Sequence, residues 1–421
     1  MITNNFKNSE IGPIPNEWEV KVLGDIAVDM ADGPFGSNLK TEHYTTNKQV
    51  RIIQLSNIGD MGWANDNVKY TTFEHAKKLR RCIAHKGCVL IAKMMPAGRS
   101  IICPDEEKEY ILGSDVVRVD FNNDIIDSLY FVYHTKSNLY LEQIAENTQG
   151  STRQRTSIGK LREILLPLPP LSEQRRIAAA LSDIDALIDN LDALIDKKRL
   201  IKQATMQQLL TGKRRIEGFK DKWVEKKLGE IGFTYNGLTN KSRDDFQKGN
   251  ALYITFLNIL NNPVLKTELF ERVKVSSTEK QNKAKKGDLF FNTSSETPEE
   301  VGICSILLNE IDDLYLNSFC FGFRLTDQNI DGLYLSYFFR SKIGRELMTS
   351  LAQGSTRYNL SKDYFLKSEI SLPPTLAEQT AISKILSDMD EEISLLEAKK
   401  EKYTHLKLGM MSELLSGRIR I

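Results

Sequence analysis

The chain has 421 residues, which is enough for two to three domains with hydrophobic cores of their own. Its 57 basic and 56 acidic residues leave a formal net charge of +1, which excludes a uniformly cationic nucleic-acid wrapper but not a local basic patch. Five cysteines without a C-x-x-C pair indicate reduced thiols. No apolar run approaches the roughly 20 residues of a membrane span, and the first residues carry no apolar segment typical of a signal peptide, so we expect a cytoplasmic protein.

Two copies of one sequence unit follow each other along the chain. The first opens at residues 11–26, where Trp18 precedes Leu-Gly-Asp-Ile, and the second opens at residues 216–231, where Trp223 precedes Leu-Gly-Glu-Ile. Each copy continues into strand-like segments rich in Val, Ile and Phe, a helical segment that begins with Asp, and a last strand. The matching segments are 51–55 and 252–256, 86–91 and 286–291, 115–119 and 319–325, 127–134 and 331–338, and 163–166 and 367–372. This order predicts an α+β fold with an internal pseudo-two-fold repeat.

A long helix is predicted at the end of each copy, over residues 171–212 and 375–417, because each stretch follows Pro-Pro and ends at Gly. At about 1.5 Å per residue, the first helix would be roughly 60 Å long. Apolar residues recur in each at spacings of four and three, the pattern of a coiled-coil seam. The seam residues are Ile177, Leu181, Ile184, Ile188, Leu191 and Ile195 in the first helix and Ile382, Leu386, Met389, Ile393, Leu396 and Tyr403 in the second. Such a seam is narrow for ordinary surface packing, so we expect the two helices to pair antiparallel; the alternative is that each packs on its own globular domain.

The starts of the two helices carry similar polar residues. Thr375 and Glu378 predict a capping box at the start of the second helix. We expect the polar side chains at both starts to face outward, where a partner protein could bind them: Glu173, Gln174, Arg175, Arg176, Glu378 and Gln379.

Motifs for catalysis are missing from the sequence. It contains no G-x-x-x-x-G-K-[ST] loop and no G-x-G-x-x-G after a strand, and its five histidines form no H-E-x-x-H or H-x-x-E-H pair. We therefore predict no catalytic residue and no metal site in this chain.

Three loops in each copy are candidates for DNA contact. The pentapeptide Gln-Gly-Ser-Thr-Arg occurs at residues 149–153 and 353–357, and its glycine, hydroxyls and guanidinium suit phosphate oxygens. Loops 32–40 and 236–243 combine turn-forming residues with small polar and basic side chains that could read base edges. Loops 93–100 and 292–296 differ in charge, so the two halves are expected to bind different sequences. Turns needed for folding alone, or ordinary surface loops, would explain the same patterns.

The predicted DNA-binding residues are Ser37, Asn38, Lys40, Lys93, Arg99, Gln149, Ser151, Thr152, Arg153, Arg155, Thr239, Asn240, Lys241, Arg243, Asn292, Ser294, Ser355, Thr356, Arg357 and Asn359.

In these residues the chain resembles the DNA-specificity subunits of type I restriction–modification systems. The resemblance covers nearly the whole chain and rests on I-P-x-x-W-x-x-x-x-L-G-[DE]-I at residues 14–26, the repeated Gly-Ser-Thr turn, and L-P-P-L-x-E-Q at residues 168–174. The second copy of the last motif, at residues 372–379, has one extra residue at Thr375.

The resemblance implies target-recognition domains at residues 1–168 and 216–372, and conserved spacer helices at 169–215 and 373–421. Each domain would read one half of a bipartite site in double-stranded DNA. The helices would set the spacing and dock two modification methyltransferase subunits, which carry S-adenosylmethionine; a restriction translocase is a further implied partner. The chain itself would be non-catalytic and without a cofactor. Two other classes stay open: a coiled-coil scaffold without sequence-specific DNA binding, and an enzyme whose site is invisible in one sequence.

Overall fold

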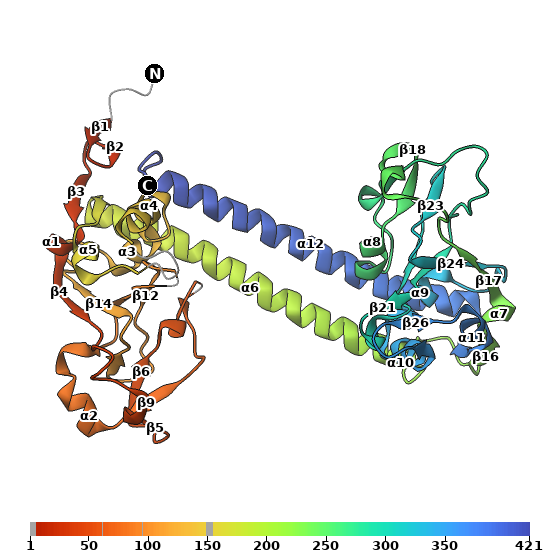
Figure 1. Ribbon diagram of the computed structural model, residues 1–421, viewed down its shortest axis with the longest axis horizontal. Helices are drawn as coiled ribbons and strands as arrows, with labels where there is room; N and C mark the ends of the chain where they lie inside the picture. Colours follow the sequence, from red (N-terminus) through yellow and green to blue (C-terminus); the bar gives the residue numbers. More distant parts are fainter. Residues whose placement is uncertain (1–5, 61, 95, 149–154) are drawn as a thin grey trace. The chain divides into compact units, whose positions relative to one another are not determined.

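The computed structural model describes residues 6–60, 62–94, 96–148 and 155–421. The chain divides into two compact units, Met1–Leu191 with Lys399–Ile421, and Asp192–Ala398 (Figure 1). Each unit contains a globular mixed part and one half of each long helix, α6 (Leu171–Leu209) and α12 (Leu376–Leu414). The α+β fold class is thereby confirmed, whereas the domain boundaries stay a prediction. Among the described residues, every helix is too short or too polar to cross a bilayer.

The first unit is built from two larger sheets and several short helices. A four-stranded sheet has the order β12-β11-β14-β4, and a five-stranded sheet has the order β10-β13-β6-β9-β5. Its strands are β1 Phe6–Ser9, β2 Gly12–Pro15, β3 Glu19–Val22, β4 Ala27–Asp32, β5 Tyr44–Thr45, β6 Val50–Ile53, β7 Ile58–Gly59, β8 Gly62–Trp63, β9 Lys69–Thr71, β10 Ile83–Ala84, β11 Val89–Ala92, β12 Ser100–Ile102, β13 Tyr110–Leu112, β14 Val116–Phe121 and β15 Leu165–Leu168. Its short α-helices are α1 Leu23–Ile26, α2 Phe73–Lys78, α3 Ser128–His134, α4 Asn138–Asn147 and α5 Ile158–Arg162.

The second unit repeats this plan. Its four-stranded sheet has the order β17-β24-β20-β22, and β18 lies between β19 and β23 in a three-stranded sheet. Its strands are β16 Val224–Lys227, β17 Gly232–Asn236, β18 Phe246–Ile254, β19 Glu271–Val273, β20 Leu289–Asn292, β21 Ser294–Ser295, β22 Cys304–Ile306, β23 Leu314–Leu316, β24 Cys320–Leu325, β25 Ala352–Gln353, β26 Tyr358–Leu360 and β27 Glu369–Leu372. Its short α-helices are α7 Leu228–Ile231, α8 Phe256–Asn261, α9 Gly332–Arg340, α10 Lys342–Leu351 and α11 Lys362–Lys367.

One central strand of each four-stranded sheet, β11 or β20, begins with at least three consecutive apolar residues because both of its faces are covered. In β11, Val89 and Ile91 face a core shared with α3 and α4, whereas Leu90 and Ala92 face the core of the five-stranded sheet. In β20, Leu289 and Phe291 likewise belong to one core and Phe290 to another. The two copies therefore use the same layering, although their core residues differ.

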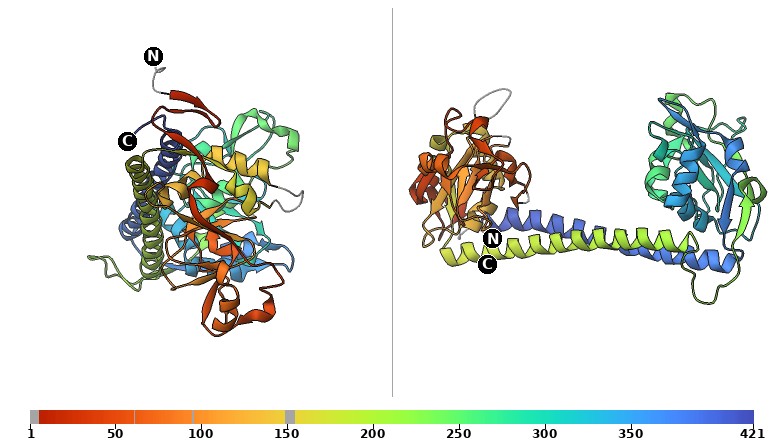
Figure 2. Two further views of the ribbon diagram at one scale, coloured as in Figure 1. Left: turned by 90° about the vertical axis from the view of Figure 1, so that its left-hand side faces the viewer. Right: turned by 90° about the horizontal axis from the view of Figure 1, so that it is seen from below.

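Within each unit the two long helices lie side by side, and the start of one helix packs against the end of the other (Figures 1 and 2). In the first unit, Ile177 and Leu181 share a core with Leu414. In the second unit, Ile382 and Leu386 share a core with Leu209. Ion pairs across the second-unit pair join Lys198 to Glu392 and Arg199 to Glu397, both at 2.6 Å. The antiparallel pairing that the seam predicts is therefore present in each unit.

The seam residues differ in how fully they are buried. Nine lie below one tenth exposure: Ile177, Leu181, Ile184, Ile188, Leu191, Ile195, Ile382, Leu386 and Ile393. Met389, Leu396 and Tyr403 are half-buried.

Candidate nucleic-acid interface

In the second unit, segments far apart in the sequence meet in one small sheet. Strand β21 pairs with β26, which also pairs with β25, and the register places Ser294 opposite Asn359. The guanidinium Nε of Arg357 donates to the hydroxyl of Ser294 at 3.3 Å. Lys362, just beyond this sheet, donates to the side-chain oxygen of Asn236, where the loop after β17 begins. All three predicted loops of the second copy therefore converge.

The turn between β25 and β26 carries the Gly-Ser-Thr-Arg sequence. Gly354 has a φ of +133°, and a Cβ at this position would lie 2.1 Å from the carbonyl oxygen of Arg357, so only glycine fits. Ser355, Thr356 and Arg357 are exposed on this turn. The glycine thus keeps the turn tight while its polar residues point to solvent, an arrangement that suits contact with a phosphate backbone.

The first unit brings together the corresponding segments. Met94 pairs with Arg155 in an antiparallel bridge, and the amide of Thr156 donates to the carbonyl of Lys93 at 2.9 Å. The ammonium of Lys93 donates to Asp32, the last residue of β4, where the loop of residues 32–40 begins. In the first copy, the described residues thus bring together two of the loops and the segment that follows the pentapeptide. The predicted residues Gln149, Ser151, Thr152 and Arg153 lie outside the described residues.

Three predicted contacts are corrected by the structure. Lys93 is 4% exposed and bound to Asp32, and Asn292 is fully buried. The Asn292 side chain accepts from the amide of Ile303 at 2.6 Å and donates to the carbonyl of Glu300 at 2.8 Å. The ammonium of Lys241, with its side chain 4% exposed, lies 2.5 Å from Glu279. These side chains hold the loops in place, and their polar groups are used within the protein.

The remaining predicted residues keep polar groups at the surface. Exposed residues are Ser37, Asn38, Lys40, Arg155, Thr239, Asn240, Arg243 and Asn359. Arg155 is paired with Asp115 at 2.8 Å, and the half-buried Arg99 with Asp60 at 3.0 Å. These exposed residues stay candidate DNA contacts.

Two exposed aromatic side chains lie beside the loops and were missed by the sequence reasoning. Phe35 is 83% exposed in the loop after β4. Phe319 is 61% exposed, and its carbonyl accepts from the amide of Thr293 next to β21. The signal in the sequence was an aromatic residue within or next to a turn rich in polar residues. Such side chains suit stacking on bases or packing against sugars.

The helix starts contradict the expectation of an outward-facing polar surface. Glu173, Gln174, Glu378 and Gln379 are at most 2% exposed, whereas Arg175 and Arg176 are exposed as expected. The Gln174 side chain accepts from the amide of Asp127, the residue that caps α3, at 2.9 Å. Gln379 accepts from the amide of Asp331, the cap of α9, at the same distance. Each glutamine therefore joins a long helix to its own globular part.

The two glutamates bind an arginine that follows the other long helix. Arg215 donates to both carboxylate oxygens of Glu378, at 2.5 and 2.7 Å. In the first unit, Arg420 donates to both oxygens of Glu173, which also accepts from the indole of Trp18. The amide of Glu378 donates to the Thr375 hydroxyl at 3.4 Å, but its side chain binds Arg215, so the predicted capping box is only half formed.

Comparisons with known proteins agree with this repeated architecture. A family described as "Type I restriction modification DNA specificity domain" matches residues 15–197 and again residues 220–404. The MjaVIII specificity subunit of Methanocaldococcus jannaschii is 28% identical over 447 residues, covering 99% of this chain and 96% of the relative. A putative MjaX specificity subunit from the same organism is 26% identical over 438 residues, covering 99% and 97%. The type I restriction-modification S subunit from M. genitalium has a similar fold, with a TM-score of 0.58 at 16% identity, over 98% of this chain and 97% of that one.

Proposed function

The chain belongs to the type I restriction–modification DNA specificity family, and from this premise we propose that each of its two copies reads one half of a bipartite DNA site. The observation that carries the proposal is the gathering of three loops around one place in the second copy, and of the corresponding described segments in the first. In the second copy, Arg357, Ser294 and Asn359 come together from segments far apart in the sequence. Loops held by a rigid sheet are suited to recognition because the scaffold fixes the geometry of their side chains.

The proposed division of labour follows from the chemistry of the loops. Basic residues such as Arg357 and Lys40 bind phosphates and set the register on DNA, whereas short polar side chains such as Asn38 and Asn240 read base edges. The loops differ between the copies, so the two half-sites differ in sequence. In this proposal the recognised ligand is double-stranded DNA in the cytoplasm.

The long helices are proposed to fix the spacing of the half-sites and to dock two modification methyltransferase subunits. Pairing of the helices within each unit, through Ile177 and Leu414 in one and Leu386 and Leu209 in the other, supports a stiff connection. Polar residues on their exposed faces, including Arg175 and Arg176, are candidates for the docking surface. S-adenosylmethionine would be bound by the methyltransferase, and a restriction translocase is a further proposed partner. No observation favours the coiled-coil scaffold without DNA recognition.

The test is to express this chain with its methyltransferase partner and sequence the methylome. A single split motif methylated only when both proteins are present is the expected result. A fluorescence anisotropy titration of the purified complex on duplexes with and without that motif then measures specificity at several salt concentrations. Equal affinity for both duplexes at every salt concentration would refute the proposal.

A further inference from the structure

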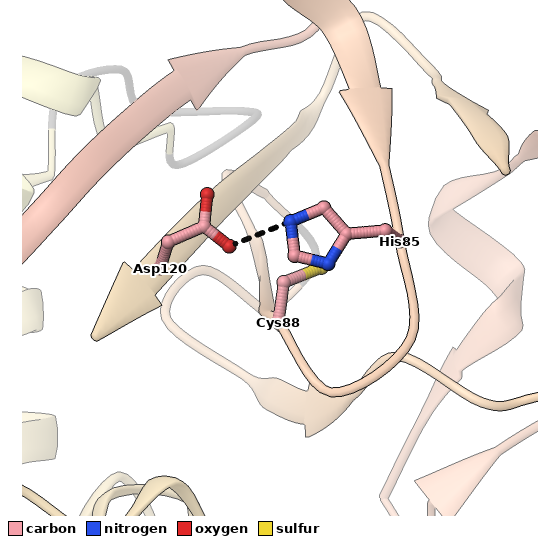
Figure 3. Close-up of side chains that lie close together, drawn as sticks. All are labelled: His85, Cys88 and Asp120. Atoms are coloured by element: carbon pink, nitrogen blue, oxygen red, sulfur yellow. Dashed lines mark ion pairs between the residues drawn. The ribbon is translucent and has the colours of Figure 1, made fainter. Parts of the chain in front are cut away.

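A histidine, a cysteine and an aspartate of the first unit meet at the edge of two sheets (Figure 3). His85 follows β10 of the five-stranded sheet, Cys88 precedes β11 of the four-stranded sheet, and Asp120 lies on β14, which pairs with β11. One ligand atom from each of the three lies within 4.8 Å of the others. The cluster is separate from the loops proposed to bind DNA.

The contact between His85 and Asp120 requires a proton or a metal ion between them. Nδ1 of His85 lies 3.1 Å from the carbonyl oxygen of Lys86, to which it donates, and this leaves Nε2 of the neutral ring as an acceptor. Nε2 faces Oδ1 of Asp120 at 3.2 Å, so two acceptors approach each other unless a proton or a metal ion is shared. Two ligands about 2.0–2.1 Å from a tetrahedral zinc ion lie roughly 3.3 Å apart, which matches this separation.

A basic side chain borders the three donors. The other oxygen of Asp120 forms an ion pair with Nε of Arg118 at 2.8 Å, an outer contact that helps to hold the carboxylate in place. Cys103 is a neighbour of Cys88 where β11 and β12 pair, and its amide donates to the carbonyl of Cys88 at 2.8 Å. Arg118 also forms an ion pair with Asp29, so its positive charge is shared between two carboxylates. The site therefore keeps its preference for a cation.

The second copy provides an internal comparison. The same Lys-Gly turn places Asp288 where the first copy has Cys88, and the strand register places Arg324 where it has Asp120. There Asp288, 1% exposed, accepts from Arg324 at 2.6 and 2.8 Å and from Tyr235 at 2.6 Å, a closed ion pair. In the first copy, an aspartate stands in the place of this arginine and a cysteine in the place of Asp288, and His85 lies beside them.

We infer that His85, Cys88 and Asp120 bind a zinc ion that joins the two sheets of the first recognition unit, with the fourth position of the ion left to water. Thiolate and imidazole donors select zinc over magnesium or calcium, which prefer oxygen ligands. The motif search could not find this site because its donors come from a turn and a distant strand rather than from one helix. The expectation that the chain has no metal site is thus replaced by this inference.

The test uses the full-length chain, stripped with a chelator and titrated with Co²⁺ and with Zn²⁺ against a chromophoric competitor. One ion per chain is expected, with a thiolate-to-cobalt charge-transfer band and the visible bands of tetrahedral cobalt. His85→Asn is the main variant because this side chain is 53% exposed and its loss should leave the fold intact. Its affinity for Zn²⁺ should fall at least tenfold, whereas His405→Asn, on the exposed face of α12, should bind as the unchanged chain does.

Two further measurements decide the identity of the ligands. Cys88→Ser should abolish the charge-transfer band, and Zn²⁺ should raise the thermal unfolding midpoint of the unchanged chain but not that of His85→Asn. The inference is overturned by the absence of a thiolate band on cobalt addition, or by equal Zn²⁺ affinities of His85→Asn and His405→Asn. If Cys88→Ser fails to fold, the difference in Zn²⁺ affinity between the two histidine variants decides whether the site exists.

Discussion

Replacing Arg215 by alanine tests the buried contact between the segment after α6 and the start of α12. Glu378 is 1% exposed and receives two charge-assisted hydrogen bonds from Arg215, which also lies over the ring of Trp223 at 5.9 Å from its centroid. The alanine leaves a buried carboxylate without its cation. Removing one partner of such a pair costs about 3–5 kcal/mol, because the desolvation penalty of the remaining charge is no longer offset.

The lower end of that range applies here, since the Arg215 side chain is 24% exposed and water can reach the gap it leaves. For a unit of this size, roughly 3 kcal/mol corresponds to a fall of about 6–12 °C in the unfolding midpoint. Thermal unfolding of the full chain followed by circular dichroism measures the change. The matched control is Arg214→Ala, the exposed neighbouring arginine.

A second substitution separates charge from packing. Adding Glu378→Gln to Arg215→Ala removes the unpaired charge and should recover part of the lost stability. Equal midpoints for Arg215→Ala and Arg214→Ala would refute the reasoning that this ion pair holds the helix start. Arg420→Ala, with Arg418→Ala as its control, repeats the experiment on Glu173 in the first unit.

Three further outcomes are expected. Arg357→Ala should weaken DNA binding several-fold and lower its salt dependence while leaving the methylated motif unchanged, because phosphate contacts position the protein on DNA and do not specify the sequence. Arg153→Ala should have the same effect. A changed motif in either variant would contradict this prediction. A heptad added to α6 lengthens it by about 10 Å, so methylation should be lost or the gap between half-sites should change; an unaltered motif at full activity argues against a spacer role. Burial lowers the pKa of His134 to about 4, so the folded state holds it neutral. Its contribution to stability is complete above pH 6.5 and is lost as pH falls toward 4, by about 3 kcal/mol. His134→Phe, which copies Phe338 of the second unit, should therefore reduce the pH dependence of the free energy of unfolding between pH 6.5 and 4. Denaturant titrations at several pH values measure this dependence, and a dependence equal to that of the unchanged chain would exclude this explanation.

The sequence by itself determined the features that depend on a local period. Seam residues such as Ile177 and Leu386 could be read from one segment because an α-helix repeats every 3.6 residues. Asp127 and Asp331 likewise mark the starts of α3 and α9, since an N-cap binds amides two or three residues away. The repeat itself appeared as matching motifs in the same order.

Tertiary structure decided which polar groups are used inside the protein and which face a partner. Glu173 looked like a surface residue because helix periodicity says nothing about an arginine that arrives after the other helix. Lys93 looked like a phosphate ligand until strand pairing placed it beside Asp32. Strand pairing elsewhere in the fold likewise brought His85 to Asp120 in the first unit and Ser294 to Arg357 in the second. Contacts between distant segments depend on the register of the strands and on which strands pair. Neither can be derived from local patterns in a single sequence.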